Sequence, residues 1–243
     1  MPATTITPLP SSGARESAPL APRWHTAGLV ALMLLVAATG TLLAPRAGVA
    51  PAPAALTLSA RLLGVYVPML VVQWGLVLYV CRVGRPRNAL PDLLGQRWAN
   101  PRRAALDLSL ALVGWGLLLA CEVAWARLFA TRAAPSVTTM LPQTWPERLA
   151  WVIVAASVGF GEELVYRGYL QTQLTAFTGS AGVGIVLQAV LFGIAHAEQG
   201  ASTAARLAVY GLAFGALARW RRSLLPGIAC HAWTDVASGL LRP

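Results

Sequence analysis

Seven apolar runs follow one another along the chain, separated by short segments that contain arginine, proline or glycine. The runs cover residues 26–43, 62–80, 104–129, 149–177, 181–197, 203–220 and 224–241. A helix needs roughly 17–25 predominantly apolar residues to cross the hydrocarbon core of a membrane. The pattern therefore predicts an all-α fold, a multi-pass transmembrane helical bundle of about seven spans.

The composition agrees with a membrane protein. Hydrophobic residues make up 56% of the chain, charged residues 12%, and the mean hydropathy is +0.60, whereas a soluble domain carries roughly 25% charged residues. The net charge of +10 could indicate a nucleic-acid partner, but the arginines lie between apolar runs and not along one polar face. We expect membrane lipid as a partner, and no nucleic acid.

The arginines also predict the orientation of the bundle. Residues 82–103 hold six arginines and one acid, and Arg219, Arg221 and Arg222 form a second cluster. With seven spans both segments lie on the same side as the N-terminus, and the positive-inside rule places that side in the cytoplasm. We expect a multi-pass protein of the cell membrane with a cytoplasmic N-terminus.

Four regions follow from these patterns. Residues 1–25, rich in Pro, Ser, Thr and Ala, are expected to form a disordered tail, and residues 26–130 the N-terminal transmembrane helices. Residues 131–148, with three prolines, are predicted to be an irregular interfacial loop, and residues 149–243 to be the C-terminal transmembrane helices. Residues 47–50 faintly resemble a signal-peptidase site, but the 18-residue length of the first run favours an uncleaved span.

Most of the candidate chemistry lies inside three of the apolar runs. The chain has nine acidic residues and three histidines. Three of these acids and two of these histidines are Glu162, Glu163, His196, His231 and Asp235. An ionisable residue at membrane depth is a functional-site hypothesis by default.

The two adjacent glutamates are predicted to have different roles. Glu163 and Arg167 are four residues apart, so on a helix they share a face and can form an ion pair that keeps Glu163 ionised. Glu162 points about 100° away and remains free to take a proton from water as a general base. The alternative is that all three residues form a buried structural ion network.

Phe192 and His196 are also four residues apart, so the phenyl ring can pack under the imidazole. If the fourth and fifth spans form a hairpin that turns at residues 179–180, Glu163 and His196 each lie about 25 Å from the turn at 1.5 Å per residue. Equal height on adjacent antiparallel helices suits a shared site. Taken alone, the Phe192–His196 pattern favours a packed histidine bonded to a neighbouring helix over a functional one.

His231 and Asp235 repeat the four-residue spacing, so the acid can accept from one imidazole nitrogen and set the tautomer of the other. An interhelical hydrogen-bond clamp is the alternative. The same rise places His231 only about 13 Å from the loop at Arg222, which conflicts in depth with Glu163 and His196. A tilted or a broken helix is needed to bring them together.

Taken in order, the three stretches resemble the CPBP family of intramembrane endopeptidases, which includes the CAAX prenyl proteases and bacterial proteins linked to bacteriocin processing and immunity. The family pattern E-E-x-x-x-R, F-x-x-x-H and H-x-x-x-N/D corresponds here to Glu162, Glu163, Arg167, Phe192, His196, His231 and Asp235. The resemblance covers about residues 149–241. Tyr166 stands where the family often has Phe, which is a departure from the pattern.

The resemblance implies an intramembrane protease that hydrolyses a peptide bond at or within the membrane. It implies that residues 149–243 form the catalytic helices and that a protein or peptide substrate is a partner. It implies that Glu162 and His196 activate water, that His231 and Asp235 stabilise the oxyanion or orient the peptide, and that Arg167 and Phe192 support the site. Family members are often labelled metalloproteases, and His196, His231 and Glu162 are the residues that would hold zinc. Because H-E-x-x-H is absent, the sequence favours metal-free hydrolysis, with no cofactor and with zinc as the alternative.

Two other functions compete with a protease. A non-catalytic membrane chaperone or bacteriocin-immunity protein could retain the motif for structure. A proton- or ion-coupled transporter also uses buried carboxylates and histidines, but the inverted repeats and paired broken helices typical of many transporters are not visible in the sequence.

Overall fold

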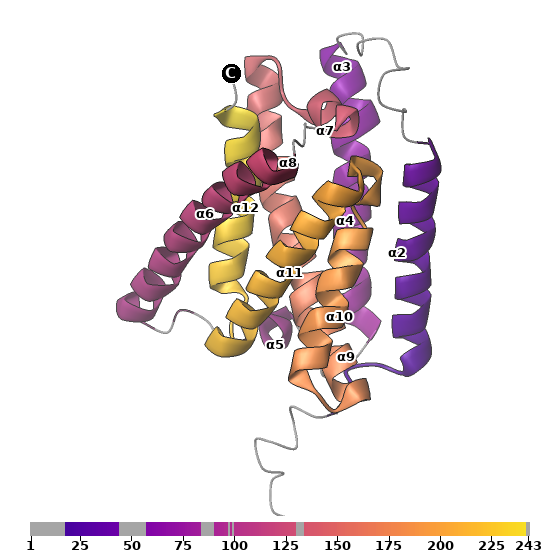
Figure 1. The fold of residues 1–243 in the computed structure, drawn as a ribbon, viewed down its shortest axis with the longest axis vertical. Helices are drawn as coiled ribbons and strands as arrows, with labels where there is room; N and C mark the ends of the chain where they lie inside the picture. Colours follow the sequence, from indigo (N-terminus) through magenta and orange to yellow (C-terminus); the bar gives the residue numbers. More distant parts are fainter. Residues whose placement is uncertain are drawn as a thin grey trace, which may run out of the picture.

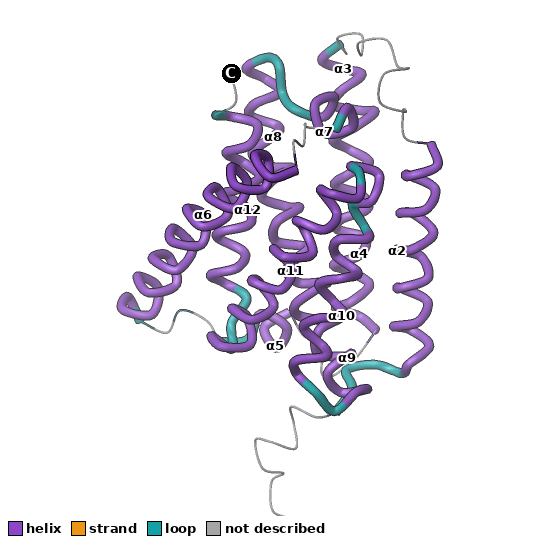
Figure 2. Tube along the Cα trace, in the orientation of Figure 1, coloured by secondary structure: helices purple, strands orange, loops and turns teal. Residues whose placement is uncertain are grey.

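The computed structural model describes residues 18–43, 57–83, 90–96, 98, 100–129 and 134–241. Within these ranges the chain is helical, apart from turns and one isolated bridge between Gly95 and Ser223, as Figure 2 shows. The elements are α2 (Arg23–Leu43), α3 (Leu58–Arg61), η1 (Leu62–Tyr66), α4 (Val67–Val83), α5 (Leu90–Leu94), α6 (Pro101–Phe129), α7 (Pro135–Met140), α8 (Trp145–Glu162), η2 (Glu163–Leu170), α9 (Gln171–Thr178), α10 (Ala181–Ile194), η3 (Ala197–Gln199), α11 (Ala201–Arg221) and α12 (Leu225–Leu240).

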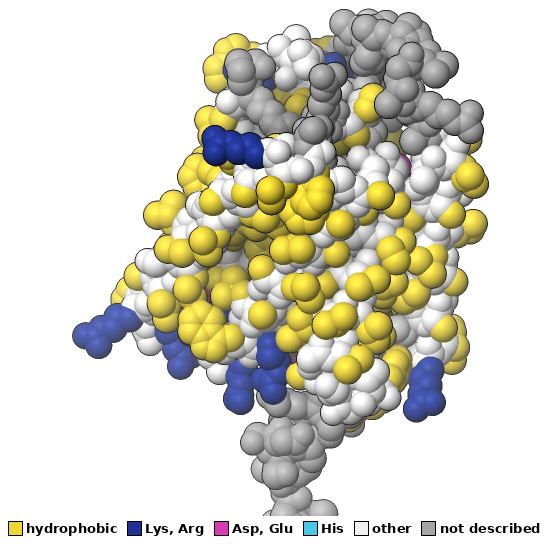
Figure 3. Space-filling view, viewed as in Figure 1, with side chains coloured by type: hydrophobic (Ala, Val, Ile, Leu, Met, Phe, Trp, Pro, Cys, Tyr) yellow, Lys and Arg dark blue, Asp and Glu magenta, His cyan; other side chains and the backbone are white. Residues whose placement is uncertain are grey.

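The helices form an upright bundle with two peripheral members. In Figure 1, α2 lies at one side of the bundle and α6 runs obliquely along the other side, while α4, α8, α10, α11 and α12 lie between them. Large apolar side chains are exposed along α6, α4 and α2, and apolar atoms cover much of the face seen in Figure 3. This is the surface expected of a protein surrounded by lipid.

The all-α, multi-pass prediction is confirmed, and each of the seven apolar runs falls largely within a helical segment. Five helical segments are long and apolar enough to cross a membrane: Arg23–Leu43, Leu58–Val83, Pro101–Phe129, Trp145–Thr178 and Ala201–Arg221. The remaining two, α10 with 14 residues and α12 with 16, are shorter. Seven is therefore an approximate count of the spans.

Some sequence predictions lie outside the described residues. These are most of the N-terminal tail (residues 1–17), the weak cleavage site at residues 47–50, and the arginines at 85, 87 and 97. The structure does describe residues 134–148, and the connection predicted to be irregular contains a short helix, α7. The next helix begins with a capping box between Thr144 and Glu147.

A buried ion pair attaches this connection to the second span. Arg61 Nε lies 3.0 Å from Glu147 Oε1, and both side chains are almost fully buried. Arg61 also donates to the carbonyl oxygens of Thr139 and Leu141. Because the guanidinium reaches both sides of the turn that follows α7, the pair fixes where α8 begins.

The two arginine-bearing segments lie at the same end of the molecule, as the seven-run pattern predicts. The amide of Leu224 donates to the carbonyl oxygen of Leu94, and the amide of Gln96 donates to that of Arg222. Basic side chains gather at the lower edge of the view in Figure 3.

Close contact between α8 and α12 depends on glycine. A Cβ on Gly159 would lie 2.6 Å from the Ala232 backbone, and one on Gly239 would lie 2.3 Å from Trp151 Nε1. Small residues at such contacts are typical of helix association in membranes. The same helix pair is joined by a hydrogen bond from Trp151 Nε1 to the carbonyl oxygen of Asp235. These contacts hold the Glu162 end of α8 beside the middle of α12.

We therefore expect Gly159→Leu to destabilise the protein by about 1–3 kcal/mol, the usual cost of overpacking, because the new side chain meets backbone that cannot rotate away. Thermal unfolding of the purified protein in detergent measures the change. The matched control is Gly116→Leu on α6, where no atom lies within 4 Å of the new Cβ. Equal melting temperatures for the two variants would contradict the close α8–α12 contact.

Candidate active site

The glutamate-bearing helix changes its hydrogen-bonding pattern at the candidate site. Helix α8 ends at Glu162, and the next eight residues, Glu163–Leu170, are π-helical and all buried. A π-helical segment within an α-helix is rare and frequently marks a functional site. The straight helix assumed from the sequence is therefore interrupted immediately after the first glutamate.

Glu163 lies at the centre of a fully buried ion pair. Arg167 Nη1 is 3.0 Å from Glu163 Oε1, and both side chains have an exposed fraction of 0%. The predicted pair is thus present. His231 Nδ1 lies 2.9 Å from the same carboxylate oxygen, and since an ionised carboxylate only accepts, this nitrogen carries the proton. Gly227 leaves room for the carboxylate, because a Cβ there would lie 3.0 Å from Glu163 Oε2.

His231 has a closer partner in the structure than the one that its sequence spacing predicts. The four-residue spacing favours Asp235 as the acceptor that sets the tautomer, but the structure gives this role to Glu163. Asp235 Oδ2 is 3.7 Å and Glu162 Oε2 is 3.6 Å from His231 Nε2, both longer than a hydrogen bond. The Glu163 contact joins residues 68 positions apart, so no local spacing could reveal it. The Nε2 edge of His231 instead faces two carboxylates.

The depth conflict is resolved by the position of the loop before α12. A Cβ on Gly168 would lie 3.2 Å from Leu224 Cδ1 and 3.5 Å from the carbonyl oxygen of Leu93. Leu224 is therefore level with Gly168, well above the turn at residues 179–180. Glu163 lies five residues before Gly168 and His231 lies seven after Leu224, so the two side chains come close enough in height for their 2.9 Å contact.

Aromatic rings enclose the ion pair on two sides. The guanidinium of Arg167 lies 4.4 Å from the ring centre of Phe192 and 5.3 Å from that of Phe214. Phe214 also stacks on His231 at 5.3 Å with an angle of 12° between the planes. The sequence singled out Phe192 but not Phe214, which lies on α11 outside the three motifs.

His196 follows α10 and packs edge-on against Phe192 at 4.9 Å between ring centres. Its Nδ1 lies 2.8 Å from the carbonyl oxygen of Phe192. A carbonyl oxygen can only accept, so Nδ1 carries the proton and the neutral ring presents a lone pair at Nε2. Asp235 interacts electrostatically with both His196 and Glu162, which brings the fifth predicted residue into the cluster.

The cluster has a sealed part and an accessible part. The Glu163 and Arg167 side chains are fully buried, whereas those of Glu162 and Asp235 are 18% and 30% exposed. Glu162 can therefore meet water or a substrate while Glu163 cannot. The arrangement can accept a proton from water at Glu162 and hold it beside His231.

The positions of the candidate ligand atoms determine whether the cluster can hold a zinc ion. Among the residues that the structure describes, no group of three or more His, Cys, Asp or Glu side chains is arranged to hold a metal ion. In particular, Nδ1 of His231 is engaged by Glu163.

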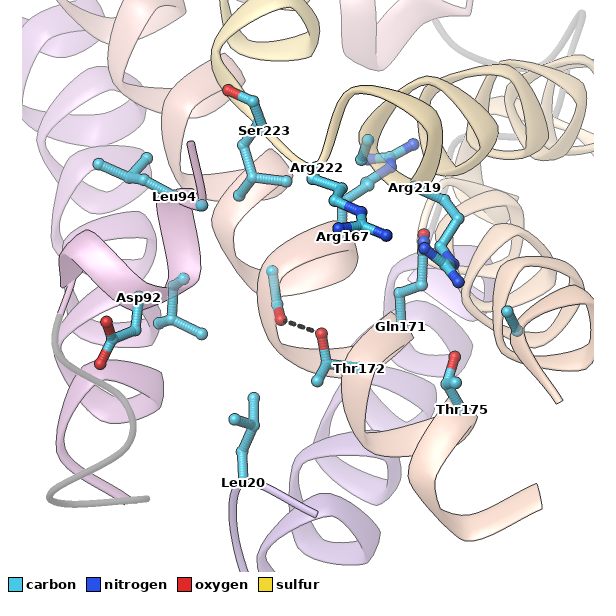
Figure 4. A pocket seen from close by; sticks show the side chains of 16 residues that line it. Leu20, Asp92, Leu94, Arg167, Gln171, Thr172, Thr175, Arg219, Arg222 and Ser223 are labelled. Carbon is cyan, nitrogen blue, oxygen red and sulfur yellow. Dashed lines mark hydrogen bonds between the residues drawn. The ribbon is translucent and has the colours of Figure 1, made fainter. Parts of the chain in front are cut away.

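A cavity of about 320 Å³ lies next to the cluster, toward the arginine-bearing end. Arg167, Gly168 and Gln171 line it, together with Arg219 and Arg222. Figure 4 shows these arginines and Gln171 on one side of the cavity and Asp92 on the other. Glu162, His196, His231 and Asp235 are not among its lining residues, so the cavity meets the cluster only through Arg167.

Residues 144–237 match the family model described as Type II CAAX prenyl endopeptidase Rce1-like. The match covers less than half of the chain but includes every residue of the cluster. It supports a protease of the CPBP family, as the motifs predict, and a CAAX-type endopeptidase in general. Comparisons with curated proteins and with solved structures gave no match.

We expect Arg167→Ala to lower the stability by on the order of 3–5 kcal/mol, because it leaves the Glu163 carboxylate buried without its partner. Thermal unfolding and expression level measure the loss. Arg206→Ala is the control. Its partner Glu122 has a side chain that is 38% exposed, so water can replace the lost contact and the effect is smaller. An Arg167→Ala protein as stable as the wild type would show that the pair is solvated.

Proposed function

We propose that this protein is an intramembrane endopeptidase that hydrolyses a peptide bond at or within the membrane, using water activated by Glu162 and His196. The observation that carries the proposal is the difference between the two adjacent glutamates. Glu163 is locked by Arg167 and His231 inside the protein, while Glu162 reaches the accessible edge of the same cluster. The family match over residues 144–237 supports the reaction class.

In the proposed reaction, Glu162 takes a proton from water as the water oxygen adds to the carbonyl carbon of the scissile peptide. The lone pair at His196 Nε2 helps to orient the water. The proton then passes from Glu162 to the amide nitrogen, the carbon–nitrogen bond breaks, and the products are a carboxylic acid and an amine. General-base catalysis of this kind typically contributes 10²–10⁴-fold to a rate.

The remaining residues hold the reacting groups in place. Arg167 and Glu163 fix His231, and the rings of Phe192 and Phe214 fix the planes of the two histidines. His231 and Asp235 are proposed to lie beside the peptide and to orient it. The proposed mechanism uses no metal step, which the absence of H-E-x-x-H from the sequence favours.

We further propose that the protein resides in the cell membrane with its N-terminus and arginine-bearing end in the cytoplasm, in contact with lipid, and that its substrate is a protein or peptide. A membrane chaperone or bacteriocin-immunity protein that retains the motif for structure is the alternative. The two functions predict different results when Glu162 is replaced. If the protein is a chaperone or an immunity protein, the replacement leaves the set of peptides in the cell unchanged.

The first test replaces Glu162 by Gln, which keeps the shape of the side chain but removes the base. We expect Glu162→Gln to abolish cleavage without changing the melting temperature, because the partly exposed carboxylate lies 3.6 Å from His231 Nε2, which is longer than a hydrogen bond. In cells, cleavage is followed by comparative proteomics of membrane and secreted peptides. With the purified protein, it is followed by the fluorescence of an internally quenched C-a-a-X peptide, in a farnesylated and in an unmodified form.

The matched control is Glu198→Gln, which changes a glutamate in η3 that bonds to Gln199 and does not contact the cluster. We expect the Glu198→Gln protein to behave like the wild type. A folded Glu162→Gln protein that cleaves at the wild-type rate would overturn the proposal. Identical peptide profiles for wild type and Glu162→Gln, with no cleavage by either purified protein, would favour the chaperone.

A second test concerns zinc and the charge of Asp235. We expect no stoichiometric zinc by elemental analysis, no loss of activity with a chelator, and retained activity in Asp235→Asn, since Asn accepts a hydrogen bond as Asp does. Zinc bound one to one, with activity removed by a chelator and restored by zinc, contradicts metal-free hydrolysis. Loss of activity in Asp235→Asn alone would instead point to a requirement for the charge.

A further inference from the structure

Peptide hydrolysis needs hydrogen-bond donors as well as a base, because negative charge develops on the carbonyl oxygen in the transition state. The cluster is poor in such donors. Ionised Glu162, Glu163 and Asp235 only accept. The Nδ1 protons of His196 and His231 are directed to the carbonyl oxygen of Phe192 and to Glu163. A neutral His196 then has no proton left for the substrate, and a proton on Nε2 of His231 faces the carboxylates of Glu162 and Asp235 at 3.6 and 3.7 Å.

Tyr166 is placed to supply a further donor. It lies four residues after Glu162, in the π-helical segment, and its side chain is almost completely buried. Its ring meets Phe192 edge-on at 5.0 Å between ring centres, on the ring that also packs against His196. The phenol interacts electrostatically with Glu162. Tyr166 therefore belongs to the same cluster as the proposed base.

The hydroxyl of Tyr166 differs from those of the other four tyrosines, all of which the structure describes. Tyr66, Tyr79, Tyr169 and Tyr210 each hydrogen-bond through their hydroxyl to protein groups. Tyr166 makes no such bond to a described residue, and its oxygen is not among the unpartnered atoms that the protein encloses completely. Buried tyrosine hydroxyls usually find a partner.

We propose that the Tyr166 hydroxyl donates a hydrogen bond to the carbonyl oxygen of the scissile peptide. The inference rests on the proposed function. As the water oxygen adds to the carbonyl carbon, the carbonyl π electrons move onto the oxygen, and the phenol proton stays on Tyr166 while its hydrogen bond to that oxygen shortens. Tyr166 is thereby a catalytic residue that touches the substrate, and a Phe at this position lacks the donor.

The test is Tyr166→Phe, which removes one oxygen atom and keeps the ring. We expect kcat for the farnesylated or the unmodified quenched peptide to fall by about 10²–10³-fold, the usual effect of removing one oxyanion donor, with KM unchanged. The melting temperature should not change, because the hydroxyl has no partner within the described protein.

Tyr169→Phe, three residues later, is the matched control. The Tyr169 hydroxyl lies 3.2 Å from Thr26 Oγ1 and 3.5 Å from Gln173 Nε2, so its removal should lower the melting temperature and leave kcat unchanged. Wild-type kcat in Tyr166→Phe overturns the inference. A rise in KM at constant kcat also overturns it, because it indicates a contact made equally in the ground state.

Glu162→Gln, measured in parallel, separates this inference from the proposed function. Full activity in Glu162→Gln overturns the function, whereas an inactive Glu162→Gln with a fully active Tyr166→Phe overturns only the role of Tyr166. If neither peptide is cleaved, the affinity for a phosphinate analogue of the farnesylated peptide is measured in place of kcat. We expect at least tenfold weaker binding to Tyr166→Phe than to the wild type, and equal binding or no binding by either protein overturns the inference.

Discussion

The buried pair of Glu163 and Arg167 is the interaction on which the rest of the site depends. Burying two charges costs several kcal/mol per ion unless geometry and further hydrogen bonds compensate. Here the compensation comes from three other helices: His231 on α12 donates to the carboxylate, while Phe192 on α10 and Phe214 on α11 cover the guanidinium. The pair therefore ties four helices to one another, and a shift of any of them would expose a charge to an apolar surrounding.

The close packing around the pair leaves little freedom for the cluster to spread. A Cβ on Gly193 would meet the carbonyl oxygen of Ala204 at 2.5 Å, and one on Gly211 would meet Ala189 Cα at 2.8 Å. Small residues thus let α10 and α11 approach backbone to backbone, as Gly159 does for α8 and α12. Since Phe192 and Phe214 are carried by α10 and α11, this packing sets the distance between the two rings that enclose Arg167.

Much of the architecture could be predicted from the sequence because it depends on patterns among residues that are close in the chain. Apolar run length gave the helices, and the four-residue spacing gave the Glu163–Arg167 pair and the Phe192–His196 contact. What escaped prediction depends on contacts between distant segments. The bond from His231 to Glu163, the burial of Phe214 beside Arg167, and the depth at which α12 begins against Gly168 leave no periodic signature. The π-helical segment likewise has no signature in the local spacing of residues.

Two glutamates that are adjacent in sequence thus acquire different chemistry from their surroundings alone. Glu163 meets a guanidinium and an imidazole N–H through Oε1 and has no exposed surface, so water does not reach it. Glu162 faces the Nε2 edge of His231 at 3.6 Å and keeps part of its surface accessible. Because both carboxylates flank the same imidazole, the locked residue orients the histidine and the accessible one is left free to exchange a proton. The start of the π-helical segment between the two residues separates these roles along the chain.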